Sequence, residues 1–235
     1  MNTRSFFQVV LRTLDVDAAR RFYAGVLGEG SLTIFQLHTQ AVERGARPHW
    51  LGHLQVPDVD AAVATSSARG ATPLGPKWIN PEGLEAAVMR DPGGAVVSLA
   101  KPSAQNLESA QHLGPDLLWS LLNTQDVESA KRNYAELVGW VFATPLDLGP
   151  LGVFHPFALE PGGAPVGSMI DIAGRSGVHT HWLFHFRVSE LEAAVAAVQS
   201  LGGIVADRVT LPNGDRIAIC DDDQGAAFTL RQPRG

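Results

Sequence analysis

The chain has a single cysteine, Cys220, among its 235 residues. One cysteine cannot form an internal disulfide, and this excludes the disulfide-stapled scaffolds of small secreted domains. Long apolar runs are also missing: the run Phe6–Leu11 is followed at once by Arg12 and soon by Asp15. It is too short for a signal peptide core or a membrane span. We therefore expect a soluble, cytoplasmic protein that does not associate with a membrane.

Basic residues are few and scattered, with 18 Lys and Arg against 24 Asp and Glu and a net charge of −6. Binding to a phosphate backbone needs clustered Lys and Arg, so nucleic acid is not an expected partner. The apolar fraction of 45% is enough for a packed core, and the length suits two domains of about 100 to 120 residues each.

The two halves of the chain repeat each other. Residues 14–23 match residues 125–134 at an offset of 111, and residues 49–58 match residues 181–190 at an offset of 132. Residues 94–99 also match residues 225–230. The two offsets differ by about 21 residues, which the first half lacks between its first helix and its second module. We therefore expect the first half to lack a hairpin.

Each half contains two copies of a shorter pattern: an apolar strand, an acidic residue and an amphipathic helix that ends near a glycine. The expected strands are Phe6–Thr13, Trp50–Val56, Leu117–Asn123 and Trp182–Val188, and the expected helices begin near Asp15, Asp58, Asp126 and Ser189. Ser189 and Glu192 have the spacing of a capping box. Between these modules the second half has room for three strands, Val141–Asp147, Gly152–Leu159 and Val166–Ile172, and the first half for one, Leu32–His38.

The segment from Leu14-Asp15-Val16 to Gly28, its counterpart from Asp126 to Trp140, and the ending Arg90–Gly94 resemble signatures of one family. This is the vicinal oxygen chelate superfamily of glyoxalases, bleomycin-resistance proteins and extradiol dioxygenases, in its tandem two-domain form. The resemblance implies an α+β fold. Four βαβββ-type modules, the first one shortened, would pair into two curved-sheet glyoxalase-like domains, at residues 1–102 and 113–235, joined by a linker at 103–112.

The resemblance also implies positions for a metal site. Metal-using members place His or Gln on first strands, seven positions before the capping acid, and Glu on last strands, four positions after the turn glycine. In this sequence those positions are Gln8, Leu51, Trp119 and Leu183 on first strands, and Ser98 and Thr229 on last strands. Of these only Gln8 could ligate in the usual way. We therefore expect no metal and no cofactor, with a displaced divalent metal site at His179, His181 and His185 as the alternative.

The residues that we expect to contact a ligand are Trp119, His181 and His185, with Asp171 as the carboxylate partner of the histidines. Alternation along a strand places His181 and His185 on one face, together with Leu183. Trp119 would either stack on a planar ligand or fill the space that the metal vacated. Trp50 and Trp182 alternate away from the histidines and should pack beneath helices. Asp221, Asp222 and Asp223 indicate a solvated turn, and Cys220 a buried strand position.

Two functions remain open from these residues. The first is a metal-free small-molecule-binding protein, active as a monomer or homodimer, whose main cavity lies in the C-terminal half because that half keeps all its strands. The alternative is an enzyme of the same superfamily, lyase, dioxygenase or hydroxylase-like, that uses cavity histidines or a displaced metal site.

Overall fold

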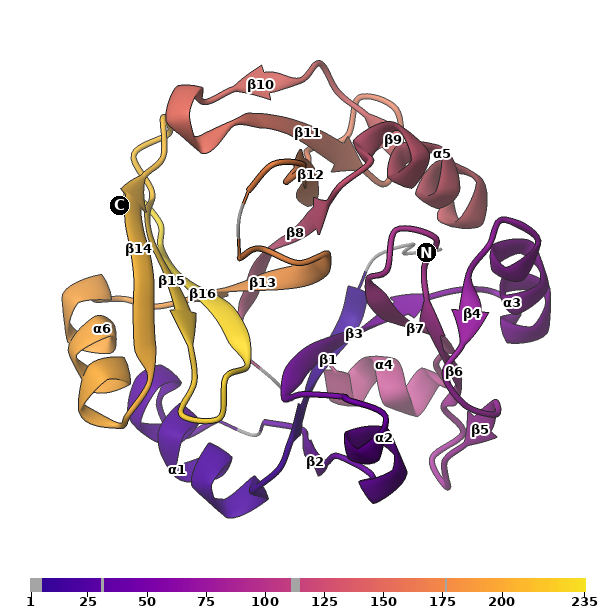
Figure 1. The fold of residues 1–235 in the computed structure, drawn as a ribbon, viewed down its shortest axis with the longest axis horizontal. Coiled ribbons are helices and arrows are strands. Elements are labelled where there is room, and N and C mark those ends of the chain that lie inside the picture. The colour runs from indigo at the N-terminus through magenta and orange to yellow at the C-terminus, as the bar shows by residue number, and fades with distance from the viewer. Residues whose placement is uncertain (1–5, 31, 111–114, 176) are drawn as a thin grey trace. The chain divides into compact units, whose positions relative to one another are not determined.

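In this computed structural model, the described part of the chain contains six α-helices, a short 3-10 helix at Gly149–Leu151 and two mixed β-sheets. Figure 1 shows how these elements follow one another along the chain. The structure describes residues 6–30, 32–110, 115–175 and 177–235. The helices are α1 (Val16–Leu27), α2 (Thr39–Glu43), α3 (Val59–Ala68), α4 (Ala104–Ala110), α5 (Val127–Val138) and α6 (Leu191–Ser200).

The first half of the chain forms a seven-stranded sheet with the order β2-β1-β3-β7-β6-β4, and β5 pairs with β6. Its strands are β1 (Phe6–Thr13), β2 (Ile34–Gln36), β3 (His49–Gln55), β4 (Thr72–Pro73), β5 (Trp78–Ile79), β6 (Glu85–Arg90) and β7 (Val96–Lys101). The segment expected as a linker contains α4.

The second half forms a nine-stranded sheet with the order β10-β11-β12-β8-β13-β16-β15-β14, and β9 pairs with β11. Its strands are β8 (Leu117–Thr124), β9 (Val141–Phe142), β10 (Leu146–Asp147), β11 (Val153–Ala158), β12 (Gly167–Asp171), β13 (His181–Arg187), β14 (Ile204–Thr210), β15 (Arg216–Asp221) and β16 (Ala227–Gln232). The expected α+β class with two repeated sheets is confirmed.

The shortened first module is visible in strand pairing. In the second half β8 pairs in parallel with β12. Three strands, β9, β10 and β11, lie between these two in the sequence. In the first half β1 pairs in parallel with β2 directly after α1, so the described residues contain no strands equivalent to β10 and β11 there. This agrees with the shorter offset in the sequence and confirms that the first half lacks a hairpin.

Three of the long helices begin as expected. Asp15, Asp58 and Asp126 each accept a hydrogen bond from the backbone N–H three residues further on, which satisfies a donor of the first helical turn.

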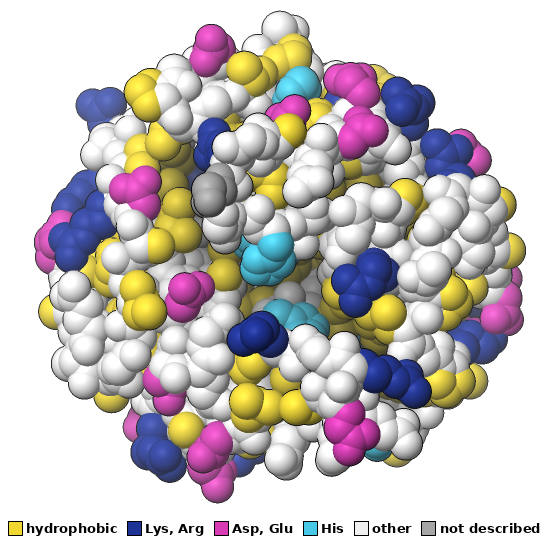
Figure 2. All heavy atoms as spheres, in the orientation of Figure 1, with side chains coloured by type: hydrophobic (Ala, Val, Ile, Leu, Met, Phe, Trp, Pro, Cys, Tyr) yellow, Lys and Arg dark blue, Asp and Glu magenta, His cyan; other side chains and the backbone are white. Residues whose placement is uncertain are grey.

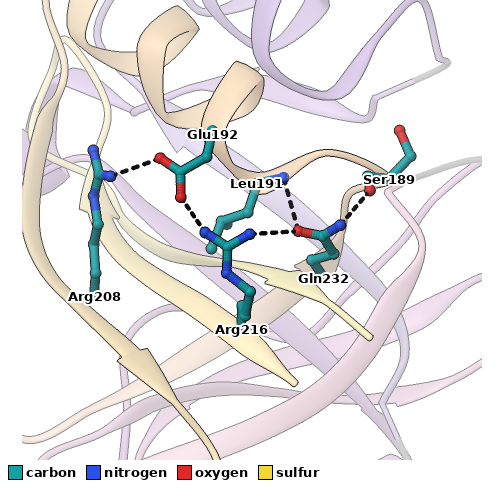
Figure 3. Close-up of polar contacts among 6 residues, drawn as sticks. All are labelled: Ser189, Leu191, Glu192, Arg208, Arg216 and Gln232. Carbon is teal, nitrogen blue, oxygen red and sulfur yellow. Dashed lines mark hydrogen bonds and ion pairs between the residues drawn. The ribbon is translucent and has the colours of Figure 1, made fainter. Parts of the chain in front are cut away.

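The fourth, α6, begins differently, and the expected capping box is wrong. Its N-cap is Glu190, which makes no side-chain capping bond. Instead Oε1 of Gln232, in β16, accepts from Leu191 N at 3.2 Å, and Nε2 of Gln232 donates to the Ser189 carbonyl at 2.8 Å (Figure 3). A residue distant in sequence thus replaces the local cap.

Contacts along the chain define two compact units, and each unit draws on both halves. Unit 1 comprises residues 1–8, 52–111 and 120–182, and unit 2 comprises residues 9–51, 112–119 and 183–235. Within unit 1, α3 packs against α5, and within unit 2, α1 packs against α6. The sheets follow the two halves, whereas helix packing joins one half to the other. The domain boundaries at residues 102 and 113 therefore stay a prediction.

A buried Trp–Tyr–Asp chain of hydrogen bonds lies in unit 2. Trp50 Nε1 donates to Tyr23 Oη at 3.0 Å, and Tyr23 Oη donates to Asp222 Oδ2 at 3.1 Å. Asp222 is only 3% exposed, and its Oδ1 accepts from Ala226 N. The expectation that the turn at Asp221–Asp223 is solvated is therefore wrong for Asp222, because its carboxylate holds both the turn and a helix tyrosine.

Unit 1 repeats this chain with equivalent residues. Trp182 Nε1 donates to Tyr134 Oη at 3.1 Å, and Tyr134 Oη donates to Asp91 Oδ2 at 3.0 Å. Since Tyr134 lies in α5 and Tyr23 in α1, Trp182 and Trp50 pack beneath helices, as expected from strand alternation.

On the surface, positive and negative side chains are interspersed over the face shown in Figure 2, without a patch of one sign. No helix in the described ranges has the length and apolar composition that crossing a bilayer requires.

Candidate functional site

The strongest candidate site lies on β13 and β16, which are parallel neighbours in unit 2. Their register places His185 opposite Thr229 and Arg187 opposite Arg231. Phe186 and Phe228 alternate to the other face, where their rings lie 6.5 Å apart and Phe228 meets Phe22 of α1. His185 and Thr229 therefore share the face that points away from the helices.

His185 and Thr229 place three polar atoms in the protein interior. His185 is 5% exposed and Thr229 is 0% exposed. Neither ring nitrogen of His185, nor Oγ1 of Thr229, has a hydrogen-bond partner among the described residues. An unsatisfied buried donor or acceptor costs about 1 to 3 kcal/mol, and such groups in native proteins point to a bound water, ion or ligand. Among the described residues His185 is the one with two such atoms, so an external partner at this pair would satisfy three buried polar atoms at once.

The charge state of His185 follows from its surroundings. Burial and, to a smaller extent, the positive charge of Arg231 together lower the pKa of His185 to about 3. The imidazole is thus neutral at physiological pH, so one ring nitrogen donates a hydrogen bond and the other accepts one.

Arg231 extends the site toward Trp119. The guanidinium carbon of Arg231 lies 5.4 Å from the centroid of the Trp119 ring, within range of a cation–π interaction. Arg231 Nε donates to Asp215 Oδ2 at 2.8 Å, and Asp215 Oδ1 accepts from Arg234 N at 2.9 Å. Sequence reasoning missed Arg231 and Asp215, although Arg231 is two residues after Thr229 and alternation places both on one face.

The other expected site residues, His181 and Asp171, belong to unit 1. Nδ1 of His181 lies 2.7 Å from the His179 carbonyl oxygen, and its Nε2 lies 3.4 Å from Asn123 Nδ2. The carbonyl can only accept, so Nδ1 carries the proton and Nε2 accepts from Asn123. The rings of His179 and His181 stack at 4.6 Å, and burial lowers the pKa of His181.

Asp171 is not brought to His181. It pairs in register with Thr124, the residue after Asn123, so its side chain points to the face opposite Asn123. Asp171 is exposed, and its Oδ1 accepts from Ala173 N at 2.6 Å within its own turn. The role of Asp171 as a partner of the histidines therefore has no geometric support.

The residues present do not fit the metal centre that the family resemblance implies. Thr229 and Ser98 stand at the last-strand positions, opposite His185 and His53, and both are buried hydroxyls rather than carboxylates. The described residues contain no group of three or more His, Cys, Asp or Glu side chains that could hold a metal ion. A divalent ion needs several such donors that converge on one point.

A shallow groove of about 110 Å³ is a weaker candidate. It lies at the start of α6 against β14 and β15 and is lined by Leu191, Glu192, Arg208, Val209, Thr210, Arg216 and Ile217. Figure 3 shows Glu192 between the two arginines, accepting from Arg208 Nη1 at 2.8 Å and pairing with Arg216. These side chains are 44% to 58% exposed, and ion pairs at such exposure contribute little.

Comparisons with known proteins agree with this fold. No family model matches the chain. Two proteins named as a candidate glyoxylase, CFP32, from Mycobacterium tuberculosis and Mycobacterium bovis, are 26% identical to it over 247 aligned positions. The alignment covers 96% of this chain and 93% of each relative.

Solved structures share the architecture at lower sequence identity. The Mn(II)-bound glyoxalase from Novosphingobium aromaticivorans has a TM-score of 0.63 at 12% identity and covers 97% of this chain and 82% of its own. The 2,3-dioxygenase LapB from Pseudomonas sp. KL28 has a TM-score of 0.58 at 14% identity, and the match covers 97% of this chain and 91% of LapB. The chain therefore shares the fold of the glyoxalases and extradiol dioxygenases, and over nearly its full length it is similar to relatives named as a glyoxylase.

Proposed function

We propose that this protein binds a small molecule at His185 and Thr229 without a metal ion. The observation that carries the proposal is the set of three buried polar atoms on these two residues, which have no partner among the described residues. A ligand with hydrogen-bonding groups would satisfy them and remove a cost of about 1 to 3 kcal/mol for each atom. Ligand sites are commonly apolar surfaces with a few polar anchors of this kind.

The surroundings of the pair support this role. Leu183 lies two residues before His185 on the same strand face and is buried, and Ile219 of β15 stands opposite Thr229. Trp119 is half-buried and lies beside Arg231, whose side chain is largely buried. The site therefore combines apolar walls, a flat aromatic surface and a small number of polar groups.

The enzymatic alternative is less well supported at this site. A general base works best when its pKa lies near the working pH, whereas burial brings the pKa of His185 to about 3. The Mn(II)-bound glyoxalase provides a fold precedent, but here a leucine, a tryptophan and a threonine stand where the family places ligands. We therefore favour binding over metal-assisted catalysis.

A fragment screen by ligand-observed NMR tests the proposal. The screen uses protein treated with a chelator, and it compares the wild type with His185→Ala and Thr229→Val. We expect compounds that bind the wild type and lose binding in both variants, while thermal unfolding shows that the variants stay folded. Compounds that bind all three proteins equally, or only after a divalent metal is added, would overturn the proposal.

A further inference from the structure

The charges around His185 and Thr229 restrict what the site can accept. We infer that the ligand is an uncharged, planar molecule whose polar group both donates and accepts hydrogen bonds, such as a carboxamide on an aromatic ring. This inference rests on the proposed function and narrows it to a class of ligand.

The charged side chains near the site are already paired. The cation that lies at the site is Arg231, and its Nη2 is 2.5 Å from Asp215 Oδ2, with side chains only 12% and 11% exposed. The next charge along the strands, Arg187, pairs with Asp116. Since both positive charges are already matched by a carboxylate, an anionic or cationic ligand would be buried without a counter-charge of its own. Burial of an unpaired charge costs several kcal/mol.

The polar atoms define the head group of the ligand. A neutral imidazole offers one donor and one acceptor, and the Thr229 hydroxyl can do either. A ligand that only accepts would leave the acceptor nitrogen of His185 unsatisfied, and one that only donates would leave its N–H unsatisfied. A carboxamide carries a carbonyl and an NH₂ group a short distance apart, and it can satisfy both.

The flat groups define the body of the ligand. The guanidinium of Arg231 lies over the indole of Trp119 at 5.4 Å, and both are planar. A planar ring makes extensive contact with such surfaces in stacked or edge-to-face geometry.

Three compounds of one shape separate the possibilities. Benzamide is neutral, benzoate is an anion and benzamidine is a cation at neutral pH. In titrations by ligand-observed NMR we expect benzamide to bind the wild type at least about tenfold more tightly than either ion, and to lose this binding in His185→Ala.

Two variants then unbalance the ion pair in opposite directions. Asp215→Asn leaves Arg231 without a counter-charge and should raise the affinity for benzoate. Arg231→Gln leaves Asp215 unpaired and should raise the affinity for benzamidine. Thermal unfolding of both variants controls for loss of fold, and the wild-type titrations decide the question if either variant is unstable.

The possible results distinguish the inference about the ligand's charge from the proposed binding function. If an ion binds the wild type as tightly as benzamide in a His185-dependent way, the charge argument is wrong and the proposed function stands. The same holds if benzamide fails to bind while a charged fragment from the screen binds at His185. If no compound of the screen or of this series depends on His185, the proposed function itself is wrong and the inference falls with it.

Discussion

The hydroxyl of Tyr134, in α5, donates a 3.0 Å hydrogen bond to Asp91, which lies in the turn between β6 and β7 of the other half of the chain. The equivalent Tyr23, in α1, donates to Asp222 between β15 and β16. Each half therefore inserts a turn carboxylate under a helix of the other half. Desolvation by burial raises the pKa of Asp91 and of Asp222, so these carboxylates depend on the donors that reach them.

Replacing Tyr134 by Phe should destabilise the protein by about 1 to 3 kcal/mol, the cost of leaving a buried polar partner unsatisfied. Both Asp91 Oδ2 and Trp182 Nε1 lose a partner in this variant. Urea unfolding measures the change, and Tyr23→Phe should give a loss of similar size. A change within about 0.5 kcal/mol, the range of ordinary surface substitutions, would show that the chain of hydrogen bonds is unimportant.

Separate fragments of residues 1–102 and 113–235 should fail to fold alone, because each lacks half of both compact units. Mixed together, they should recover a cooperative thermal transition, since α3 can pack on α5 and α1 on α6. Circular dichroism of each fragment and of the mixture tests this. Two fragments that unfold cooperatively on their own would favour independent domains with boundaries at 102 and 113.

Acid should destabilise the wild type through His185. The pKa of this residue is about 3 in the folded protein against an ordinary value of 6.5. Below about pH 6.5 the unfolded chain therefore binds a proton that the folded protein excludes, and stability falls as the pH drops toward 3. Between about pH 7 and pH 5 the wild type should lose about 2 kcal/mol more than His185→Leu in urea unfolding. Equal losses in the two proteins would mean that the pKa of His185 in the folded protein stays near its ordinary value.

Protein purified without a His-tag should contain no stoichiometric divalent metal, since hydroxyl and apolar side chains stand at the family's ligand positions. Elemental analysis before and after chelator dialysis measures this directly. A tightly held Zn, Fe, Mn or Ni that disappears in His185→Ala would instead establish a displaced metal site.

Local patterns in the sequence predicted the regular elements well. Strand alternation and the aspartate caps placed β1, β3, β8 and β13 and three of the four long helices within a residue or two. The offsets also predicted the missing hairpin. These features depend on residues that are close together in the sequence, so they can be predicted from one sequence alone.

Hydrogen bonds and ion pairs between residues far apart in the sequence could not be predicted from such local patterns. Gln232 caps α6 from a strand about 40 residues away, and Asp222 is buried because Tyr23, from the opposite end of the chain, reaches it. In the candidate site the sequence indicated His185 and Trp119, whereas the ion pair of Arg231 with Asp215 required the register of β16 and the turn before β15. Asp171 was chosen for its nearness in sequence, but its strand register turns it to the opposite face.

The proposed working site is His185 with Thr229, without a metal ion. Its most direct test is the affinity of one compound from the screen for the chelator-treated wild type, for His185→Ala and for His53→Ala, the matched position in the first half. We expect His185→Ala to weaken binding by about 1 to 3 kcal/mol, and His53→Ala to leave it nearly unchanged. Equal losses at the two positions, or binding that returns only when a divalent metal is restored, would contradict this account.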